Sequence, residues 1–203
     1  RPGVADAPCD IDVDLVRVGR TLSTVRATLS QEGKSRLTVL AAYADLASSA
    51  GIDSDITLPS PTSPAPDDCV QRSAENQGVD LPILDRLDTR LDPACATPGA
   101  SSEALLRGMI RFIDGRAPDT RSLLLFTDSF PPSPLAKLGS VGWVPTLELT
   151  VHVRRRPAPG WIIAELRTDD LNEGRMVETG ALWDSEGRLV AQSRQIGLVM
   201  KRD

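Results

Sequence analysis

Histidine and cysteine, which nucleophilic and zinc chemistry often use, are rare in this sequence of 203 residues. His152 is the single histidine and no G-x-S-x-G segment is present, which argues against a serine hydrolase. The three cysteines, Cys9, Cys69 and Cys95, are odd in number and widely spaced, without the C-x-x-C pairs typical of zinc or redox sites. We expect free thiols and no metal site.

Asp128 is a candidate for acid–base chemistry. It ends an apolar run that begins after Pro118 and Asp119 and stops before Pro131, a composition that predicts a buried helix of about three turns over residues 118–128. At the C-terminal end of such a helix, burial and the helix dipole both disfavour the carboxylate and raise its pKa, which makes it a better base. The alternative is that Asp128 only caps the loop at Pro131.

His152 is the only candidate for a mechanism that pairs a histidine with an acid, as in a dehydratase. It shares the polar face of a strand predicted over residues 146–154 with Glu148 and Thr150. Six residues of strand separate it from Thr146 by about 20 Å. We therefore expect a solvated surface histidine.

The elements that must position these residues are mostly strands, indicated by period-2 alternation of apolar and β-branched residues. Strands are predicted over residues 11–18, 21–29, 36–45, 83–92, 105–113, 146–154, 161–168, 175–184 and 188–201. One buried helix followed by a long antiparallel meander predicts an α+β fold in which the sheet wraps around the helix. Residues 48–80 concentrate Ser, Pro, Gly and Asp without any period, which predicts a linker.

Composition and charge exclude several classes of protein. A hydrophobic content of 40% and a charged content of 25% are ordinary for a globular domain. The net charge of −5 provides no basic field for nucleic acid, so we expect no nucleic-acid partner. No apolar run approaches the roughly 20 residues that a bilayer requires, so we expect no membrane association. The widely spaced cysteines and the absence of a leader-like start favour a cytoplasmic location.

The two halves of the chain are similar to each other. Arg1-Pro2-Gly3 followed by three strands parallels Arg156-Pro157 and Gly160 followed by three strands. A tandem repeat of this kind would lack, in its first copy, the counterpart of the helix. The bare sheet would expose more apolar surface than soluble monomers usually tolerate. We therefore expect further residues ahead of Arg1, or a second subunit, to cover that face.

Three segments carry a family likeness, namely residues 109–128 with their M-I-R and F-T-D, residues 143–154 (WVPTLELTVHVR) and residues 187–197 (GRLVAQSRQIG). On these segments the chain resembles the type II acyl-CoA thioesterases. The resemblance implies a double hotdog fold in which residues 1–47 are the remainder of the first repeat, 48–80 the linker and 81–203 the second repeat. It also implies acyl-CoA as the substrate, with no metal and no cofactor.

The resemblance implies a catalytic trio. The family's helix aspartate corresponds to Asp128, its threonine at the start of the next strand to Thr146, and its glutamine in the last strand to Gln195. Asp128 would act as base or orient a water molecule that the other two also hold. Apart from the family, Gln195 falls on the small and apolar face of its strand, where a buried amide must find partners, of which a neighbouring backbone group is the common one.

The run Arg154-Arg155-Arg156 is the one local basic cluster in the sequence. Arg154 and Arg156 could contact the phosphates of CoA, since such a ligand needs a positive patch. The alternative is a solvated strand end.

Together these observations predict a homo-oligomeric thioester hydrolase of lipid metabolism that acts on fatty acyl-CoA. The alternative is a hotdog module that binds acyl-CoA without turnover, which the incomplete first repeat favours.

Overall fold

The computed structural model describes residues 6–47, 51–52, 56–77 and 80–200, and the chain divides into two compact units between residues 53 and 54. The Arg1-Pro2-Gly3 motif and Lys201, at the end of the last predicted strand, lie outside the described residues. None of the helices in the described part of the chain is long and apolar enough to cross a membrane.

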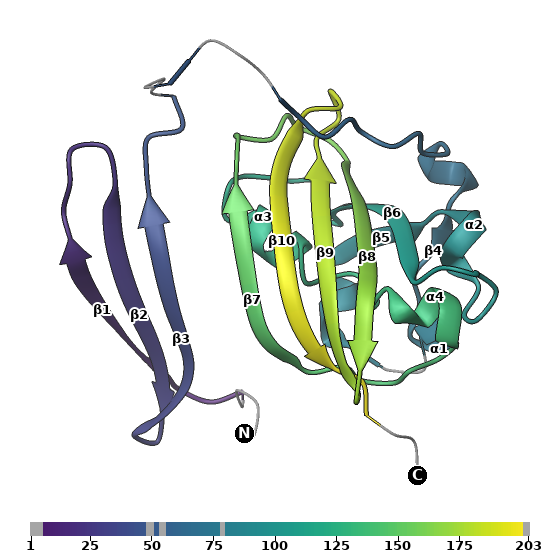
Figure 1. Cartoon of the computed structure of the whole chain (residues 1–203), viewed down its shortest axis with the longest axis horizontal. Coiled ribbons are helices and arrows are strands. Elements are labelled where there is room, and N and C mark those ends of the chain that lie inside the picture. Colours follow the sequence, from purple (N-terminus) through teal and green to yellow (C-terminus); the bar gives the residue numbers. More distant parts are fainter. Residues whose placement is uncertain (1–5, 48–50, 53–55, 78–79, 201–203) are drawn as a thin grey trace. The chain divides into compact units, whose positions relative to one another are not determined.

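The first unit is a three-stranded antiparallel sheet in the order β1-β2-β3 (Figure 1). Its strands are β1 (Asp10–Arg17), β2 (Ser23–Gln31) and β3 (Lys34–Tyr43), which confirms the strands predicted here. The turn between β2 and β3 uses positive φ angles at Glu32 (52°) and Gly33 (69°), as a tight hairpin requires. Large apolar side chains such as Ile11, Val13 and Leu15 are exposed, and no helix occurs among the described residues of this unit.

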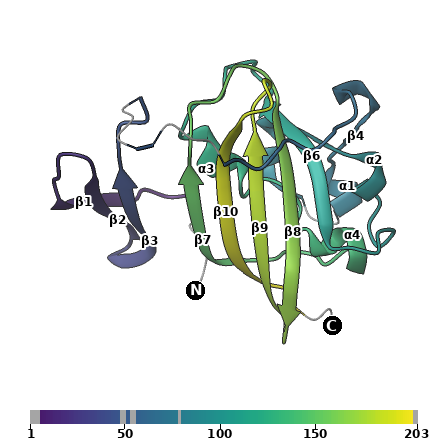
Figure 2. The ribbon, with the colours of Figure 1, turned by 45° about the horizontal axis from the view of Figure 1, so that its top comes forward.

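The second unit is a seven-stranded antiparallel sheet in the order β4-β5-β6-β8-β9-β10-β7. Its strands are β4 (Val70–Gln71), β5 (Leu87–Leu91), β6 (Leu105–Phe112), β7 (Thr146–Val153), β8 (Ile162–Asn172), β9 (Arg175–Trp183) and β10 (Leu189–Leu198). Figure 2 shows β7, β10, β9, β8 and β6 side by side in this order. The strands predicted from residue 105 onward are therefore confirmed, whereas the strand predicted over 83–92 is limited to β5, because a 3-10 turn, η2 (Pro82–Asp85), precedes it.

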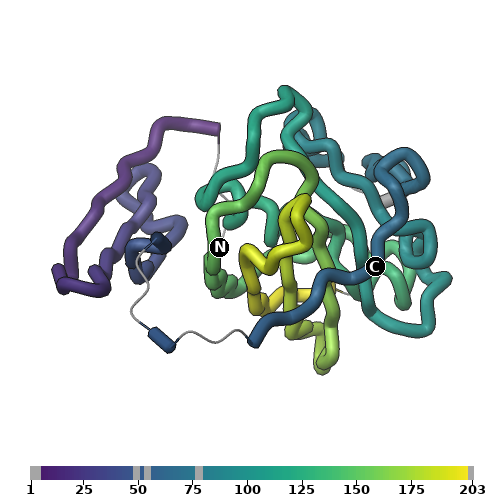
Figure 3. Tube along the Cα trace, turned by 90° about the horizontal axis from the view of Figure 1, so that it is seen from above, coloured from purple at the N-terminus to yellow at the C-terminus, as the bar shows by residue number. Residues whose placement is uncertain are grey.

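The segment expected to be an irregular linker over residues 48–80 differs from that expectation in its second part. It forms the 3-10 turn η1 (Pro66–Asp68), β4 and the short helix α1 (Ala74–Gln77), and β4 pairs with β5. Trp183 Nε1 donates a hydrogen bond to the Leu58 carbonyl at 2.9 Å, and Arg90 Nη1 donates one to the Pro66 carbonyl at 2.8 Å. Figure 3 traces residues 56–77 in blue along the second unit. Prolines leave their carbonyls available as acceptors, so a segment without hydrophobic period can still pack against a sheet.

The predicted three-turn helix is wrong in length and burial. The observed helix α3 (Ser122–Phe126) has five residues, and Leu124 and Leu125 on it are 49% and 39% exposed rather than buried. At its start, the Asp119 carboxylate accepts the N–H groups of Arg121 and Ser122, bonds of the kind that cap the first turn of a helix. The Ser122 N–H and, after it, the Arg121 guanidinium, which also donates to this carboxylate, hold the pKa of Asp119 at about 2.

The C-terminal end of α3 also has a local cause. The hydroxyls of Thr127 and Ser129 donate to the carbonyls of Leu124 and Leu125, at 2.9 Å and 2.6 Å, so side chains take up carbonyls that a longer helix would use. Two prolines follow, and the chain then enters a second short helix, α4 (Pro134–Leu138). Asp128 therefore lies in the turn after α3 and not within a helix.

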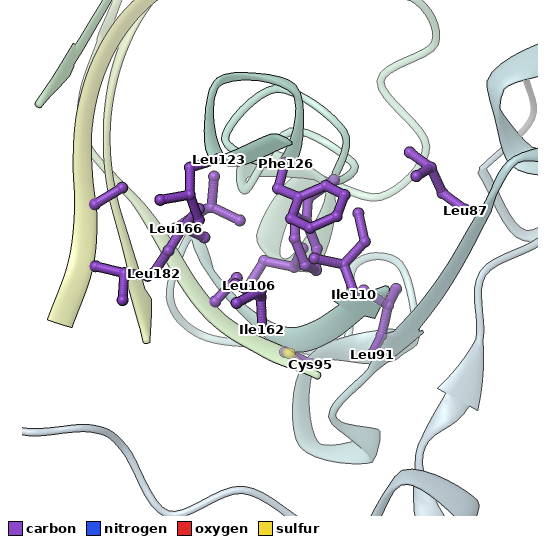
Figure 4. Packing of buried hydrophobic residues seen from close by; sticks show 14 of the residues in the cluster. Leu87, Leu91, Cys95, Leu106, Ile110, Leu123, Phe126, Ile162, Leu166 and Leu182 are labelled. Atoms are coloured by element: carbon purple, nitrogen blue, oxygen red, sulfur yellow. The ribbon is translucent and has the colours of Figure 1, made fainter. Parts of the chain in front are cut away.

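The core of the second unit lies between the sheet and α3. Leu123 and Phe126 point from α3 toward strand residues that include Leu106, Ile110 and Leu166 (Figure 4). All of these side chains are 3% exposed or less. Further buried members come from β5, β8, β9, β10 and the helix α2 (Pro93–Ala96). The sheet therefore packs around a central helix, as predicted, although the helix is short.

The tight turn between β9 and β10 depends on a buried carboxylate, that of Asp184, and yields a prediction on stability. Its oxygens accept the N–H groups of Ala158, Glu186 and Arg188 and the Arg188 guanidinium. Burial alone would raise the pKa of Asp184, but these bonds outweigh it and hold the pKa below its ordinary value. A depressed folded-state pKa stabilises the fold above the unfolded value of about 3.9, and this contribution is lost as the pH falls through the folded value.

We therefore expect Asp184→Asn to lower the Tm at pH 7 by on the order of 5 °C and to flatten the loss of stability below about pH 4. Thermal unfolding followed by circular dichroism from pH 3 to pH 7 measures both effects. Glu186→Gln, on the same turn but exposed, is the control and should leave both quantities close to wild type. An Asp184→Asn protein with wild-type Tm and acid profile would contradict this assignment.

Candidate active site

The three side chains Asp128, Thr146 and Gln195 converge on one point of the second unit. Gln195 Nε2 lies 2.6 Å from Asp128 Oδ1 and 2.6 Å from Thr146 Oγ1. Thr146 Oγ1 in turn donates to Asp128 Oδ1 at 3.2 Å. The structure therefore brings together residues that are up to 67 positions apart in the sequence, within hydrogen-bond distance of one another.

The strands place Thr146 and Gln195 on neighbouring positions of one face. Thr146 begins β7 and pairs with Gly197 of β10, two residues beyond Gln195, at an irregularity in the strand register. An added Cβ at position 197 would lie 2.7 Å from Met176 Cε, so the end of the Met176 side chain would have to shift to admit a larger residue. Gln195 is buried. Its amide nitrogen donates hydrogen bonds to two side chains, those of Asp128 and Thr146, and not to the neighbouring backbone group that the sequence analysis considered.

Asp128 is held from the opposite side, by the turn that follows α3. Its backbone N–H donates to the Leu125 carbonyl, and its carboxylate faces Gln195 and Thr146. Among the described residues its carboxylate makes no hydrogen bond with the loop at Pro131, so the geometry does not support a purely capping role. The turn directs the carboxylate across to the sheet.

The environment of Asp128 disfavours its charged form. Burial of the carboxylate raises the pKa of Asp128 above its ordinary value and prevails over the hydrogen bonds from Gln195 and Thr146, which lower it. The residue as a whole keeps an exposed surface, whereas Oδ1 is enclosed by its two donors. The direction agrees with the sequence-based expectation, but burial is the main cause, because a helix of five residues has little dipole.

A cavity of about 70 Å³ adjoins the three side chains. Its remaining wall is mostly apolar, with two charged side chains, and consists of Arg72, Leu81, Thr127, Phe130, Pro132, Trp143, Val144, Leu166, Met176 and Glu178. This volume exceeds what one water molecule needs. The arrangement can therefore hold a water molecule against a carboxylate, beside several apolar side chains.

Two cavity residues, Glu178 and Arg72, were missed by the sequence analysis. Glu178 had a detectable signal, since it alternates with Met176 and Gly180 on the inward face of β9. Arg72 had none, because it follows β4 in the segment without period. Burial lowers the pKa of Arg72 to about 10, which leaves it positively charged at neutral pH.

The other residues singled out from the sequence lie away from the trio. Arg154 and Arg156 are exposed and follow the end of β7 opposite to Thr146, about 25 Å along the strand. His152 is exposed on β7, as predicted. Within the described ranges, no group of three or more His, Cys, Asp or Glu side chains could hold a metal ion.

Two models of one protein family match this chain. The model of the acyl-CoA thioesterase C-terminal domain matches residues 66–199, and the model of the acyl-CoA thioesterase N-terminal domain matches residues 1–47. Curated relatives from Mycobacterium tuberculosis and Mycobacterium bovis, both uncharacterized proteins, are 34% identical over 85 residues. That alignment covers 42% of this chain, and the chain spans only 29% of the length of these relatives.

Solved structures are similar over nearly the whole chain. A protein of Thermobifida fusca, provisionally named thioesterase II, matches with a TM-score of 0.82 and 30% identity, covering 98% of this chain and 74% of its own. A hotdog protein of unknown function from Alicyclobacillus acidocaldarius matches with a TM-score of 0.79 and 20% identity, covering 95% and 73%. The second likeness concerns the fold alone. The predicted α+β hotdog fold is thus confirmed, with a shorter helix than expected.

Proposed function

Because this chain belongs to the acyl-CoA thioesterase family, we propose that it hydrolyses the thioester of a fatty acyl-CoA with a water molecule held by Asp128, Thr146 and Gln195. The observation that carries this proposal is the set of three mutual hydrogen bonds beside a partly apolar cavity. Family membership supports acyl-CoA as the substrate class, and the trio offers groups that thioester hydrolysis needs.

The proposed reaction begins with a water molecule between Asp128 and the thioester carbonyl. As the water oxygen attacks the carbonyl carbon, Asp128 accepts a proton from the water. The π electrons of the C=O bond move onto the carbonyl oxygen. The C–S bond then breaks, the free acid forms, and the CoA thiolate takes up the proton that Asp128 holds. A raised pKa suits Asp128 for both accepting and returning this proton.

Thr146 and Gln195 orient the reactants in this scheme. The Gln195 amide nitrogen carries two N–H groups, which in the structure point at Asp128 and Thr146. A water molecule that enters the cavity can exchange for one of these bonds and so be placed next to the carboxylate. Pre-positioning of this kind removes entropy from the barrier.

Release of free CoA thiol from a panel of acyl-CoAs of increasing chain length tests the proposal. We expect turnover with at least one acyl-CoA at a kcat on the order of 1 s⁻¹ or more, typical of enzymes. Binding of acyl-CoA, measured by calorimetry, without any thiol release would instead support the alternative of a non-catalytic binding module. Absence of both binding and release would contradict either function.

A further inference from the structure

We propose that Glu178 is a positioning residue of this site: it holds the loop 129–133 and, through this loop, the carboxylate of Asp128. The inference deepens the proposed function and rests on it, since Asp128 is the proposed base. Glu178 is 3% exposed, lines the same cavity as Asp128 and takes no part in the hydrogen bonds of the trio.

The loop 129–133 begins directly after Asp128, and buried charged side chains bind both of its ends. Arg72 Nη1 donates to the Ser129 carbonyl, and Glu178 Oε2 accepts the Ser133 N–H at 2.7 Å. Ser133 is 0% exposed, so its N–H would remain unpaired in the interior without this acceptor. Glu178 therefore fixes the end of the loop at Ser133, and the loop in turn positions Asp128, the residue directly before it.

The position of Glu178 in the sheet couples the loop to the trio. Glu178 lies directly opposite Gln195 of β10 on one side and Thr168 of β8 on the other. Side chains at such opposed positions have Cβ atoms about 5 Å apart. Thr168 Oγ1 contacts Ser133 Oγ at 2.8 Å. Thr168, Glu178 and Gln195 thus lie in one row across β8, β9 and β10. The first two contact Ser133 at the end of the loop, and the third belongs to the trio.

The hydrogen bond to the Ser133 N–H is the means by which Glu178 holds the loop. Burial raises the pKa of Glu178, the bonds with Ser133 oppose this, and the nearby Asp128 raises it further. Asp128 and the cationic Arg72 are the charged groups that line the cavity with it. Burial thus disfavours the charged form of Glu178, and a glutamine, whose side-chain oxygen also accepts an N–H, should replace most of its role.

The test compares Glu178→Leu, which removes the acceptor, with Glu178→Gln, which keeps it. We expect Glu178→Leu to lower kcat about tenfold with KM within about twofold of wild type, because a misplaced base affects the reaction more than binding. Glu178→Gln should recover most of this loss. Asp184→Asn, about 20 Å along β9, is the control for general destabilisation and should lower the Tm but keep kcat.

A double mutant separates positioning from a purely structural role. In an Asp128→Asn background, Glu178→Leu should not lower the residual rate further, because it acts through the carboxylate that is already absent. A tenfold loss in both backgrounds, or a lower Tm with unchanged kcat, would overturn the proposal.

Carboxyl-detected NMR provides a readout that does not need activity. We expect the titration midpoint of Asp128 to move by about half a pH unit or more in Glu178→Leu and to stay in place in Glu178→Gln. An unchanged midpoint in both overturns the positioning role, whereas a wild-type protein that hydrolyses no acyl-CoA overturns only the proposed function. If Glu178→Leu does not fold, Thr168→Val removes the neighbouring bond to Ser133, and an unchanged Asp128 midpoint in that variant overturns the proposal.

Discussion

Replacing Asp128 by asparagine is expected to lower kcat/KM for acyl-CoA hydrolysis by on the order of 10² or more while the chain stays folded. The asparagine keeps the shape of the side chain and an oxygen that accepts hydrogen bonds from Gln195 and Thr146, which lie 2.6 Å and 3.2 Å from it. It cannot accept the water proton. Thiol release measures the rate, and circular dichroism reports the fold.

The pH dependence provides a second signature of Asp128. The base must be ionised to act, and burial raises its pKa, so kcat/KM should fall with decreasing pH at a higher value than the ordinary aspartate pKa of about 3.9. Asp128→Asn should lack this acid limb in its residual rate. Asp114→Asn, an exposed aspartate paired with Arg116, is the matched control and should keep both rate and limb. Unchanged turnover in folded Asp128→Asn would refute its role as base.

The strands were predictable because their pattern is local. Along β8, β9 and β10 inward and outward side chains alternate, so the period of two in the sequence corresponds to burial in the sheet. The same pattern placed Gln195 on the inward face. What it could not provide is the partner of Gln195, because a bond to Asp128 depends on a turn that no period specifies.

The helix shows where local composition is insufficient. An apolar run between prolines predicted one helix over residues 118–128, but side-chain-to-backbone bonds from Thr127 and Ser129 compete with helical bonding at its C-terminal end. A count of apolar residues does not register the hydrogen bonds that Ser and Thr side chains make with the backbone, so it cannot predict how these residues shorten a helix. The shortened helix leaves Asp128 in a turn, where other contacts must fix it.

The sequence pattern also could not predict which distant groups the isolated charged residues Arg72 and Glu178 contact. Arg72 lies in a segment whose Pro- and Ser-rich composition indicates a linker, yet its guanidinium binds the Ser129 carbonyl 57 residues away. The strand pattern placed Glu178 on the inward face of β9, but the position of a single acidic residue on that face does not predict which N–H donates to it. The family resemblance predicted the trio, whose side chains the structure brings within hydrogen-bond distance, whereas the groups around the trio required coordinates.

Replacing Gln195 by glutamate is expected to lower kcat/KM near neutral pH by on the order of 10² and to move the acid limb to higher pH. The wild-type amide nitrogen donates to Asp128 and Thr146, both at 2.6 Å. A glutamate of the same shape loses both donors and places a second carboxyl against the first. Two carboxyls this close share one proton, so the pair titrates with a raised apparent pKa.

Gln192→Glu is the matched control, because Gln192 lies on the exposed face of the same strand and its replacement by glutamate adds the same charge. It should keep the wild-type rate and acid limb. Raising the pH should remove the shared proton in Gln195→Glu and recover part of its rate, whereas Asp128→Asn, which has no base to ionise, should recover nothing. Wild-type activity in Gln195→Glu at neutral pH would contradict the placement of Gln195 against the base, since a second carboxyl at 2.6 Å must compete with Asp128 for its proton.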